Sequence, residues 1–97
     1  MTKSVLLTLK LPHHISNDIS EEIEEMKLLA NTLDYNIVYS EIQRKLKIDP
    51  STYFGKGKIK QIKNKIELLS VETIFINDEI KPNHFKNLKK ILGDKVT

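Results

Sequence analysis

SVLLTLKL, residues Ser4–Leu11, is the stretch of sequence from which the fold of this chain can be worked out. It is a short run rich in valine and leucine, and it is closed by Pro12, which cannot donate a hydrogen bond to a β-ladder. A short apolar run bounded in this way is typical of a buried strand. We therefore predict a first strand over Ser4–Leu11 and interpret the rest of the chain outward from it.

The residues that follow carry the pattern of an amphipathic helix. Asp18 followed by Glu21 is an aspartate version of the capping box that often begins a helix. Apolar residues then recur every three or four positions from Ile19 to Leu33. The next segment, Tyr35–Ile42, is rich in β-branched and aromatic residues and predicts a second strand.

The second half of the chain repeats this alternation of strand and helix. Gly55 and Gly57 permit unusual backbone angles just before a helix that we expect to begin near Lys58. Glu72–Asn77 predicts a third strand, and Pro82 suits the first position of a third helix because a helix start needs no N–H there.

The order of these elements predicts the fold class. Gly93 can cap the third helix, and Lys95–Thr97 has the composition of a strand that has only begun. The order is then β-α-β-α-β-α-β, with three helices as right-handed crossovers. We expect an α/β fold with an open, mostly parallel four-stranded sheet whose last strand is cut short.

One domain accounts for the whole length. The chain has 97 residues, and independent domains need about 50 to 200, so we predict a single domain over residues 1–97. The absence of cysteine excludes disulfides, thiolate zinc sites and a cysteine nucleophile. No segment has the pattern of a secretion signal or a membrane-spanning helix, so we expect a cytoplasmic protein with no membrane partner.

Charge is divided unevenly along the sequence. The segment from Asp18 to Asp34 holds six acidic residues and one lysine. The segment from Arg44 to Lys65 holds eight basic residues and one aspartate. The middle of the chain is therefore suited to attract an anion.

The cluster YFGKGK at Tyr53–Lys58 is the most informative candidate site. Glycines, lysines and a helix N-terminus converge there, and such a place favours phosphate. It is not a Walker A loop, since Ile59 stands where a Ser or Thr would hold magnesium, and it lacks the third glycine of a dinucleotide fingerprint. A helix-entry loop with solvated lysines is the alternative interpretation.

Other polar residues give weaker signals. Asp78 and Glu79 follow the third predicted strand and are a possible secondary site for a metal, although a solvated turn is the favoured interpretation. The histidines, His13, His14 and His84, lack metal-ligand spacing, so we expect them at the surface. Since Ser51 and Thr52 have no evident base, we predict no catalytic residue and no metal site.

Several segments, taken together, resemble one family. These are STYFGKGK at Ser51–Lys58, EEMKLLANT at Glu24–Thr32, NDEI at Asn77–Ile80 and NLKKILG at Asn87–Gly93. They resemble, in register from about Glu24 to Val96, the amino-terminal domain of the HflX family of ribosome-associated GTPases. Two positions depart from the family pattern: Lys81 replaces a serine-like cap, and Asp34 replaces a small residue, often glycine, at the end of the first helix.

The resemblance implies a parallel α/β domain that precedes a helical hairpin and a GTPase domain in a longer protein. GTP and magnesium are implied for that intact protein, and no cofactor is expected for the present residues. The implied partners are the large ribosomal subunit with its RNA, where the family is linked to splitting or rescuing stalled ribosomes, and the GTPase domain itself. ATP-related and RNA-unwinding activities are also ascribed to this region of the family.

Two hypotheses about function follow. The first is a non-catalytic module that binds ribosomal RNA phosphates, with candidate residues Tyr53, Gly55, Lys56, Gly57, Lys58, Lys60 and Lys63. The second is an ATP phosphate site at the Gly55–Lys58 loop, with Asp78 or Glu79 near magnesium. A docking surface for the GTPase domain would use the same lysines.

Overall fold

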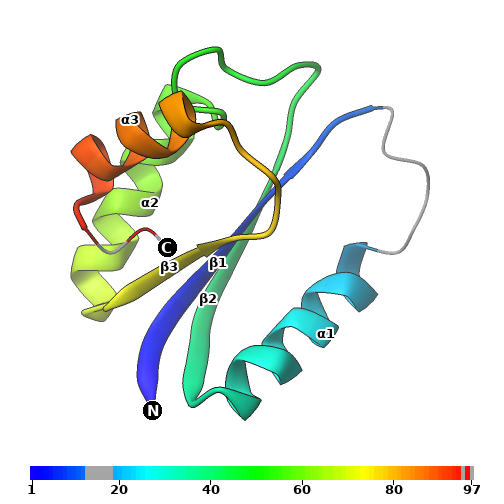
Figure 1. The fold of residues 1–97 in the computed structure, drawn as a ribbon, viewed down its shortest axis with the longest axis vertical. Helices are drawn as coiled ribbons and strands as arrows, with labels where there is room; N and C mark the ends of the chain where they lie inside the picture. The colour runs from blue at the N-terminus through cyan, green and yellow to red at the C-terminus, as the bar shows by residue number, and fades with distance from the viewer. Residues whose placement is uncertain (13–18, 95, 97) are drawn as a thin grey trace.

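The computed structural model describes residues 1–12, 19–94 and 96. Its elements are β1 (Thr2–Lys10), α1 (Ile19–Thr32), β2 (Tyr35–Arg44), α2 (Lys56–Leu69), β3 (Thr73–Ile76) and α3 (Pro82–Leu92). The strands form a parallel sheet in the order β2-β1-β3. As Figure 1 shows, α1 lies on one side of this sheet, and α2 and α3 lie on the other. The predicted α/β class, the parallel sheet and the three helices are confirmed.

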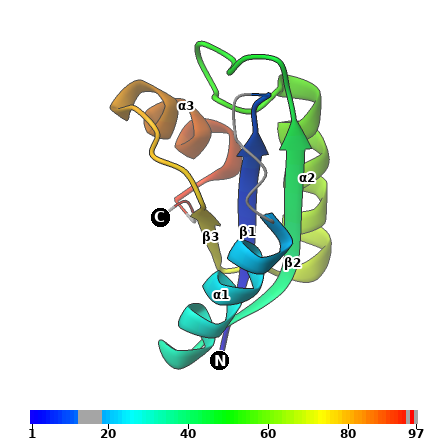
Figure 2. The same ribbon diagram turned by 90° about the vertical axis from the view of Figure 1, so that its right-hand side faces the viewer.

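The central strand β1 is covered on both faces of the sheet and pairs with a parallel strand on each edge. All six residues from Ser4 to Leu9 are buried, which is typical of a strand with a neighbour on each edge and a helix layer on each face. Side chains alternate between the faces, so Val5, Leu7 and Leu9 enter the core with α2 and α3. Figure 2 shows β1 between its two neighbours.

The larger core lies under α2 and α3. Helix α2 buries Ile59, Ile62 and Ile66 there, at the spacing of three and four that the sequence predicts. Helix α3 adds Leu88 and Leu92. On the other face, α1 buries only Ile23 and Ala30 among its described side chains, so the two helix layers differ greatly in apolar contact.

The predicted four-stranded sheet is wrong by one strand. Among the described residues the sheet has three strands, and Val96 makes a single parallel bridge to Ile74 at the edge of β3. One bridge does not make a strand. Lys95, Thr97 and the predicted helix cap Asp18 lie outside the described residues, as do His13 and His14.

Helix α2 begins at Lys56, two residues earlier than predicted. Gly55 is its N-cap with an extended backbone, and the Gly55 carbonyl accepts the first helical hydrogen bond from Ile59 N–H at 3.0 Å. Neither glycine has a positive φ; the left-handed residue of this loop is Tyr53, at φ 67°. Gly55 instead lets the Gln43 side chain approach closely, because a Cβ there would lie 2.9 Å from Gln43 Nε2 and that side chain would have to shift.

Asp34 and Lys81, the two positions that depart from the family pattern, sit at helix ends. Asp34 has φ 69°, in the left-handed region where glycine is favoured after a helix. The backbone N–H of Lys81 donates to His84 Nδ1 at 3.3 Å, so a histidine ring one turn along satisfies the start of α3.

Candidate functional site

The loop between β2 and α2 is held in place by Asp49. Its Oδ1 accepts hydrogen bonds from Ser51 N–H at 2.8 Å, from Ser51 Oγ at 2.9 Å and from Thr52 N–H at 3.1 Å. Asp49 and Tyr53 also exchange a pair of backbone hydrogen bonds, each 3.0 Å long. The hydrogen bonds from the Ser51 and Thr52 backbone lower the pKa of Asp49 to about 2. The loop is thus a fixed support for the start of α2.

Helix α3 fastens the same loop from the other side. The carbonyl of Pro50 accepts hydrogen bonds from Asn83 Nδ2 at 3.2 Å and from His84 Nε2 at 3.1 Å. The carbonyl of Ser51 accepts one from Asn87 Nδ2 at 2.8 Å. The Nε2–H tautomer of His84 is assigned because Nδ1 accepts from Lys81 N–H.

The prediction of a surface histidine at position 84 is wrong. His84 is only 3% exposed, because it shares one helix face with Leu88 and Leu92 and the loop covers it. Tyr53 is likewise buried, at 8% exposure, with its ring 5.5 Å from that of His84 and 5.3 Å from that of Phe54. Burial, followed by the charge of Asp78, raises the pKa of the Tyr53 hydroxyl. Tyr53 therefore packs in the core, apart from the exposed lysines.

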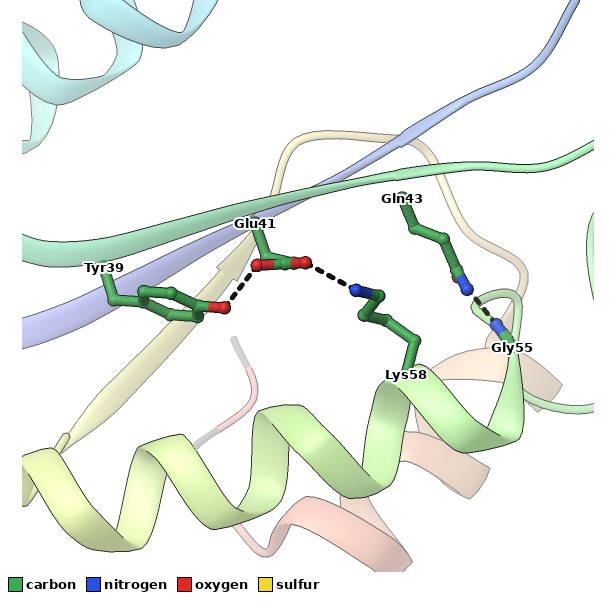
Figure 3. A network of polar contacts seen from close by, with 5 residues as sticks. All are labelled: Tyr39, Glu41, Gln43, Gly55 and Lys58. Carbon is green, nitrogen blue, oxygen red and sulfur yellow. Dashed lines mark hydrogen bonds and ion pairs between the residues drawn. The ribbon is translucent and has the colours of Figure 1, made fainter.

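A polar network joins the edge strand β2 to α2, as Figure 3 shows. Tyr39, Glu41 and Gln43 alternate along β2, so their side chains project toward the helix. Glu41 accepts a hydrogen bond from the Tyr39 hydroxyl and forms an ion pair with Lys58 Nζ at 2.6 Å. Gln43 Oε1 accepts from Gly55 N–H at 2.8 Å.

This network shifts the pKa of Glu41 and of Tyr39. Burial raises the pKa of Glu41, but the hydrogen bonds from Lys58 and Tyr39 and the charges of Lys58 and Lys65 outweigh burial and leave the pKa lowered. Burial, the hydrogen bond to Glu41 and the charge of Glu41 raise the pKa of Tyr39 to about 12. Lys65 Nζ also lies 5.5 Å from the centre of the Tyr39 ring, a cation–π contact.

The structure separates the predicted lysines into two groups. Lys58 faces β2 and is paired with Glu41, and its side chain is 24% exposed. Lys56, Lys60 and Lys63 lie on another face of α2 and are exposed; we call them the lysine row. Their spacing of four and three residues places them on one side of the helix.

The lysine row borders a groove between α2 and α3. The groove encloses about 370 Å³ and is also lined by Ile59, Asn64, Glu67 and, from α3, Ile91. The two ion pairs found among the described residues involve Lys27 and Lys58, so the lysine row has no acidic partner there. The first turn of α2 contains no acidic residue either. The positive end of the helix dipole adds to the charge of Lys56.

An ATP phosphate site at Gly55–Lys58 would need groups that are already bonded. The Gly55 N–H donates to Gln43, and Lys58 is paired with Glu41. Gly57 lies inside the first turn of α2, with no atom within 4 Å of the position of a Cβ. The space beside Gly57 is open, but the loop offers fewer free groups to a phosphate than the sequence pattern indicates.

Asp78 and Glu79, the predicted secondary site, have different surroundings. Asp78 Oδ2 accepts a hydrogen bond from Leu9 N–H at 3.0 Å and so completes the end of β1, whereas Glu79 is exposed. Among the residues that the structure describes, no three His, Asp or Glu side chains lie close enough to hold a metal ion. None of the described helices combines the length and the apolar character needed to cross a bilayer.

Sequence reasoning missed the role of β2. The predicted strand Tyr35–Ile42 includes Tyr39 and Glu41 without any further role, and Gln43 lies just outside it. In the structure, Glu41 pairs with Lys58 and Gln43 accepts from Gly55 N–H. A signal was present, since polar residues at alternate positions of a strand mark one polar face. Recognising that this face meets α2 required the strand order.

Comparison with known proteins places these features in a family context. Residues 20–97 match the family described as GTP-binding GTPase N-terminal. The chain is 37% identical over 79 residues to the GTPase HflX of Lacrimispora saccharolytica, and 32% identical over 81 residues to that of Caldanaerobacter subterraneus. These alignments cover 81% and 84% of this chain but 19% of each relative, so the chain spans about a fifth of their length.

Solved structures show the same fold. A GTP-binding protein from the hyperthermophilic archaeon Sulfolobus solfataricus, in complex with GDP, superposes with a TM-score of 0.68 at 25% sequence identity. The superposition covers 99% of this chain and 26% of that protein. A crystal structure of SsGBP with GDP gives the same TM-score at 26% identity.

Proposed function

The chain belongs to the family of GTP-binding GTPase N-terminal domains, as found in HflX, and on that basis we propose that it is a non-catalytic module that binds the RNA of the large ribosomal subunit. The lysine row of α2 makes the contact with RNA phosphates. In an intact HflX-like protein, this contact supports the engagement of ribosomes that are to be split or rescued, while GTP and magnesium act in the GTPase domain.

The observation that carries this proposal is the uncompensated charge of the lysine row. Three ammonium groups lie along about 10 Å of one helix face, since an α-helix rises about 1.5 Å per residue. They border a groove whose lining contains one acid, Glu67, near the far end of α2. Phosphates of an RNA strand recur at a comparable spacing, so the row can follow a backbone without reading its bases.

Lysines suit this task because each is a flexible point charge. Lysine does not fix the geometry of its partner as arginine does, so recognition rests on charge and shape. The buried Tyr53 offers no stacking surface beside the row. We therefore expect binding that depends steeply on salt and little on sequence.

The proposal is tested by sedimentation of the chain with purified large ribosomal subunits. Lys60→Glu reverses the middle charge of the row and should lower affinity about tenfold or more at physiological salt. Lys27→Glu, on α1 and on the other side of the sheet, is the matched control and should leave binding unchanged. Equal losses in the two variants would mean that only net charge matters, and the proposal would be wrong.

A further inference from the structure

A second hollow lies at the carboxyl ends of β1 and β2. It encloses about 290 Å³ and is lined by Lys10, Leu11, Pro12, Arg44, Lys45 and Leu46; we call it the strand-end hollow. Lys45 N–H donates to the Lys10 carbonyl at 3.0 Å, so the two segments remain joined where the strands end.

The position of the strand-end hollow follows from the topology. Helix α1, the element after β1, lies on one face of the sheet, and α2, the element after β2, lies on the opposite face (Figure 1). Neighbouring strands whose connections part in this way open a crevice at their carboxyl ends, and open α/β sheets bind ligands in such crevices. The hollow therefore lies at an edge of the sheet that is suited to a ligand.

The charge around the hollow is positive and uncompensated. Lys10, Arg44 and Lys45 line it, and none of its described lining residues is acidic. The two ion pairs within residues 1–12, 19–94 and 96 involve Lys27 and Lys58, so none of these three cations is neutralised by an acid of that part of the chain. The ammonium of Lys45 lies beside Gly55 instead, 3.3 Å from the position of a Cβ there, so Lys10 and Arg44 are the cations of the hollow. Two cations at one hollow favour an anion, and arginine forms paired hydrogen bonds to phosphate.

The rest of the lining is apolar. Leu11, Pro12 and Leu46 contribute it, and Leu46 is 88% exposed, the highest exposure among the large apolar side chains of the described residues. Within residues 1–12, 19–94 and 96, such a side chain is left almost uncovered. A flat apolar group would cover it, and the Arg44 guanidinium offers a further plane for stacking.

We propose that the strand-end hollow binds one unstacked nucleotide, with its phosphate held by Lys10 and Arg44 and its base lying on Leu11, Pro12 and Leu46. The volume of about 290 Å³ is near the lower limit of about 300 Å³ for ligand pockets, so the hollow takes a single nucleotide unit. That unit comes from a free nucleotide or from an unpaired position in RNA. The RNA source rests on the proposed function; the free nucleotide does not.

The test uses three probes with the whole chain: adenosine 5′-monophosphate, a short oligoadenylate, and an RNA duplex of the same length. Leu46→Ser removes the apolar cover from an exposed position, so folding should be unaffected. Leu68→Ser, at a position 77% exposed on α2, is the matched control. We expect the oligoadenylate to bind more tightly than the duplex, and Leu46→Ser to weaken oligoadenylate binding about tenfold while duplex binding stays constant.

The outcomes separate the source of the nucleotide. Backbone amide shifts at Arg44–Lys47 on adding the monophosphate, lost in Leu46→Ser, would support a site for free nucleotide. Tight binding of the oligoadenylate alone, with the same dependence on Leu46, would support the RNA source. If Leu46→Ser and Leu68→Ser bind all three probes as the unchanged chain does, the proposal is overturned.

The same titrations separate this site from the proposed function. A Lys60→Glu variant should lose duplex and oligoadenylate affinity together and keep the monophosphate shifts at the hollow. If Lys60→Glu binds both RNAs normally while Leu46→Ser does not, the proposed role of the lysine row is wrong and the nucleotide site at the strand-end hollow is supported. If Leu46→Ser binds both RNAs normally while Lys60→Glu does not, the lysine row is the RNA contact and the proposed nucleotide site at the hollow is wrong.

Discussion

Lys58 Nζ lies 2.6 Å from Glu41 Oε1, and this one contact removes Lys58 from the exposed charge of α2. The pair is partly buried, with the two side chains 24% and 22% exposed, and the Tyr39 hydroxyl donates a hydrogen bond to the same carboxylate. The strand β2 is an edge of the sheet, so the pair fastens that edge to the helix above it. Lys58 therefore supports the structure, whereas Lys56, Lys60 and Lys63 face outward.

Lys58→Met should lower stability without affecting RNA binding. The substitution leaves the Glu41 carboxylate without its cation, which we expect to reduce the free energy of unfolding by about 1 kcal/mol, between the values for surface and buried pairs. Urea denaturation measures the stability of the variant, and sedimentation with large ribosomal subunits measures its binding. A stable variant with lost binding would mean that Lys58 contacts RNA instead of Glu41.

The Tyr39 hydroxyl should make stability fall at high pH. Its pKa of about 12 in the folded chain exceeds the ordinary value of 10.0, so the folded state keeps a proton that the unfolded state releases. The stabilisation is complete below pH 10.0 and is lost as the pH rises to about 12, a change of about 1 kcal/mol after allowance for solvent.

Tyr39→Phe tests this prediction. The variant should lose the tyrosinate absorbance component that titrates near pH 12, and its stability should vary less over that range. Tyr35→Phe is the control on the same strand. Loss of a component that titrates near pH 10.0 instead would contradict the hydrogen bond to Glu41.

Gly55 and Gly57 should respond in opposite ways to alanine. Gly57→Ala places a methyl group in open space within the first turn of α2 and should stabilise the chain by up to about 1 kcal/mol. Gly55→Ala brings a Cβ to 2.9 Å from the Gln43 side chain, so the hydrogen bond from Gly55 N–H must shift or break, at a cost of about 1 kcal/mol. Thermal melting of both variants checks the difference, and equal shifts would contradict the described contact.

Asp49 should make the loop sensitive to acid. Because its pKa is lowered from 3.8 to about 2, its stabilisation is present above pH 3.8 and is lost as the pH falls toward 2. Asp49→Ala should remove that part of the acid dependence and cost about 1 kcal/mol at neutral pH, whereas Asp49→Asn keeps an acceptor and should cost less. Acid titrations of stability for the two variants and the unchanged chain provide the measurement. If the variants lose stability below pH 3.8 in the same way as the unchanged chain, the carboxylate charge is not involved.

Much of the fold could be predicted because local patterns and burial agreed. The apolar run of β1 and the three- and four-residue spacing of α2 both depend on contacts that one segment can signal by itself. His84 could not be placed, because its burial depends on the Asp49–Phe54 loop, which is distant in sequence. The fourth strand was overestimated since composition indicates that a segment favours a strand but not how many residues find a partner.

The candidate site was predicted in part for the same reason. The basic character of α2 follows from its sequence, but which lysines stay free depends on the face that Glu41 presents from β2. The strand-end hollow joins residues 10–12 to residues 44–46, so only the pairing of β1 with β2 brings it together. Spacing within one segment carries no information about either arrangement.

The central claim is that the lysine row contacts phosphates, and the slope of affinity against salt tests it most directly. Binding to large ribosomal subunits should be measured over a salt series for the unchanged chain, for a variant with Lys56, Lys60 and Lys63 replaced by glutamine, and for Lys58→Gln. Each lost phosphate contact should reduce the log–log slope by roughly 0.7 to 0.9, so the triple variant should lose about 2.1 to 2.7 and Lys58→Gln almost nothing. An equal slope for the triple variant and the unchanged chain would contradict the claim.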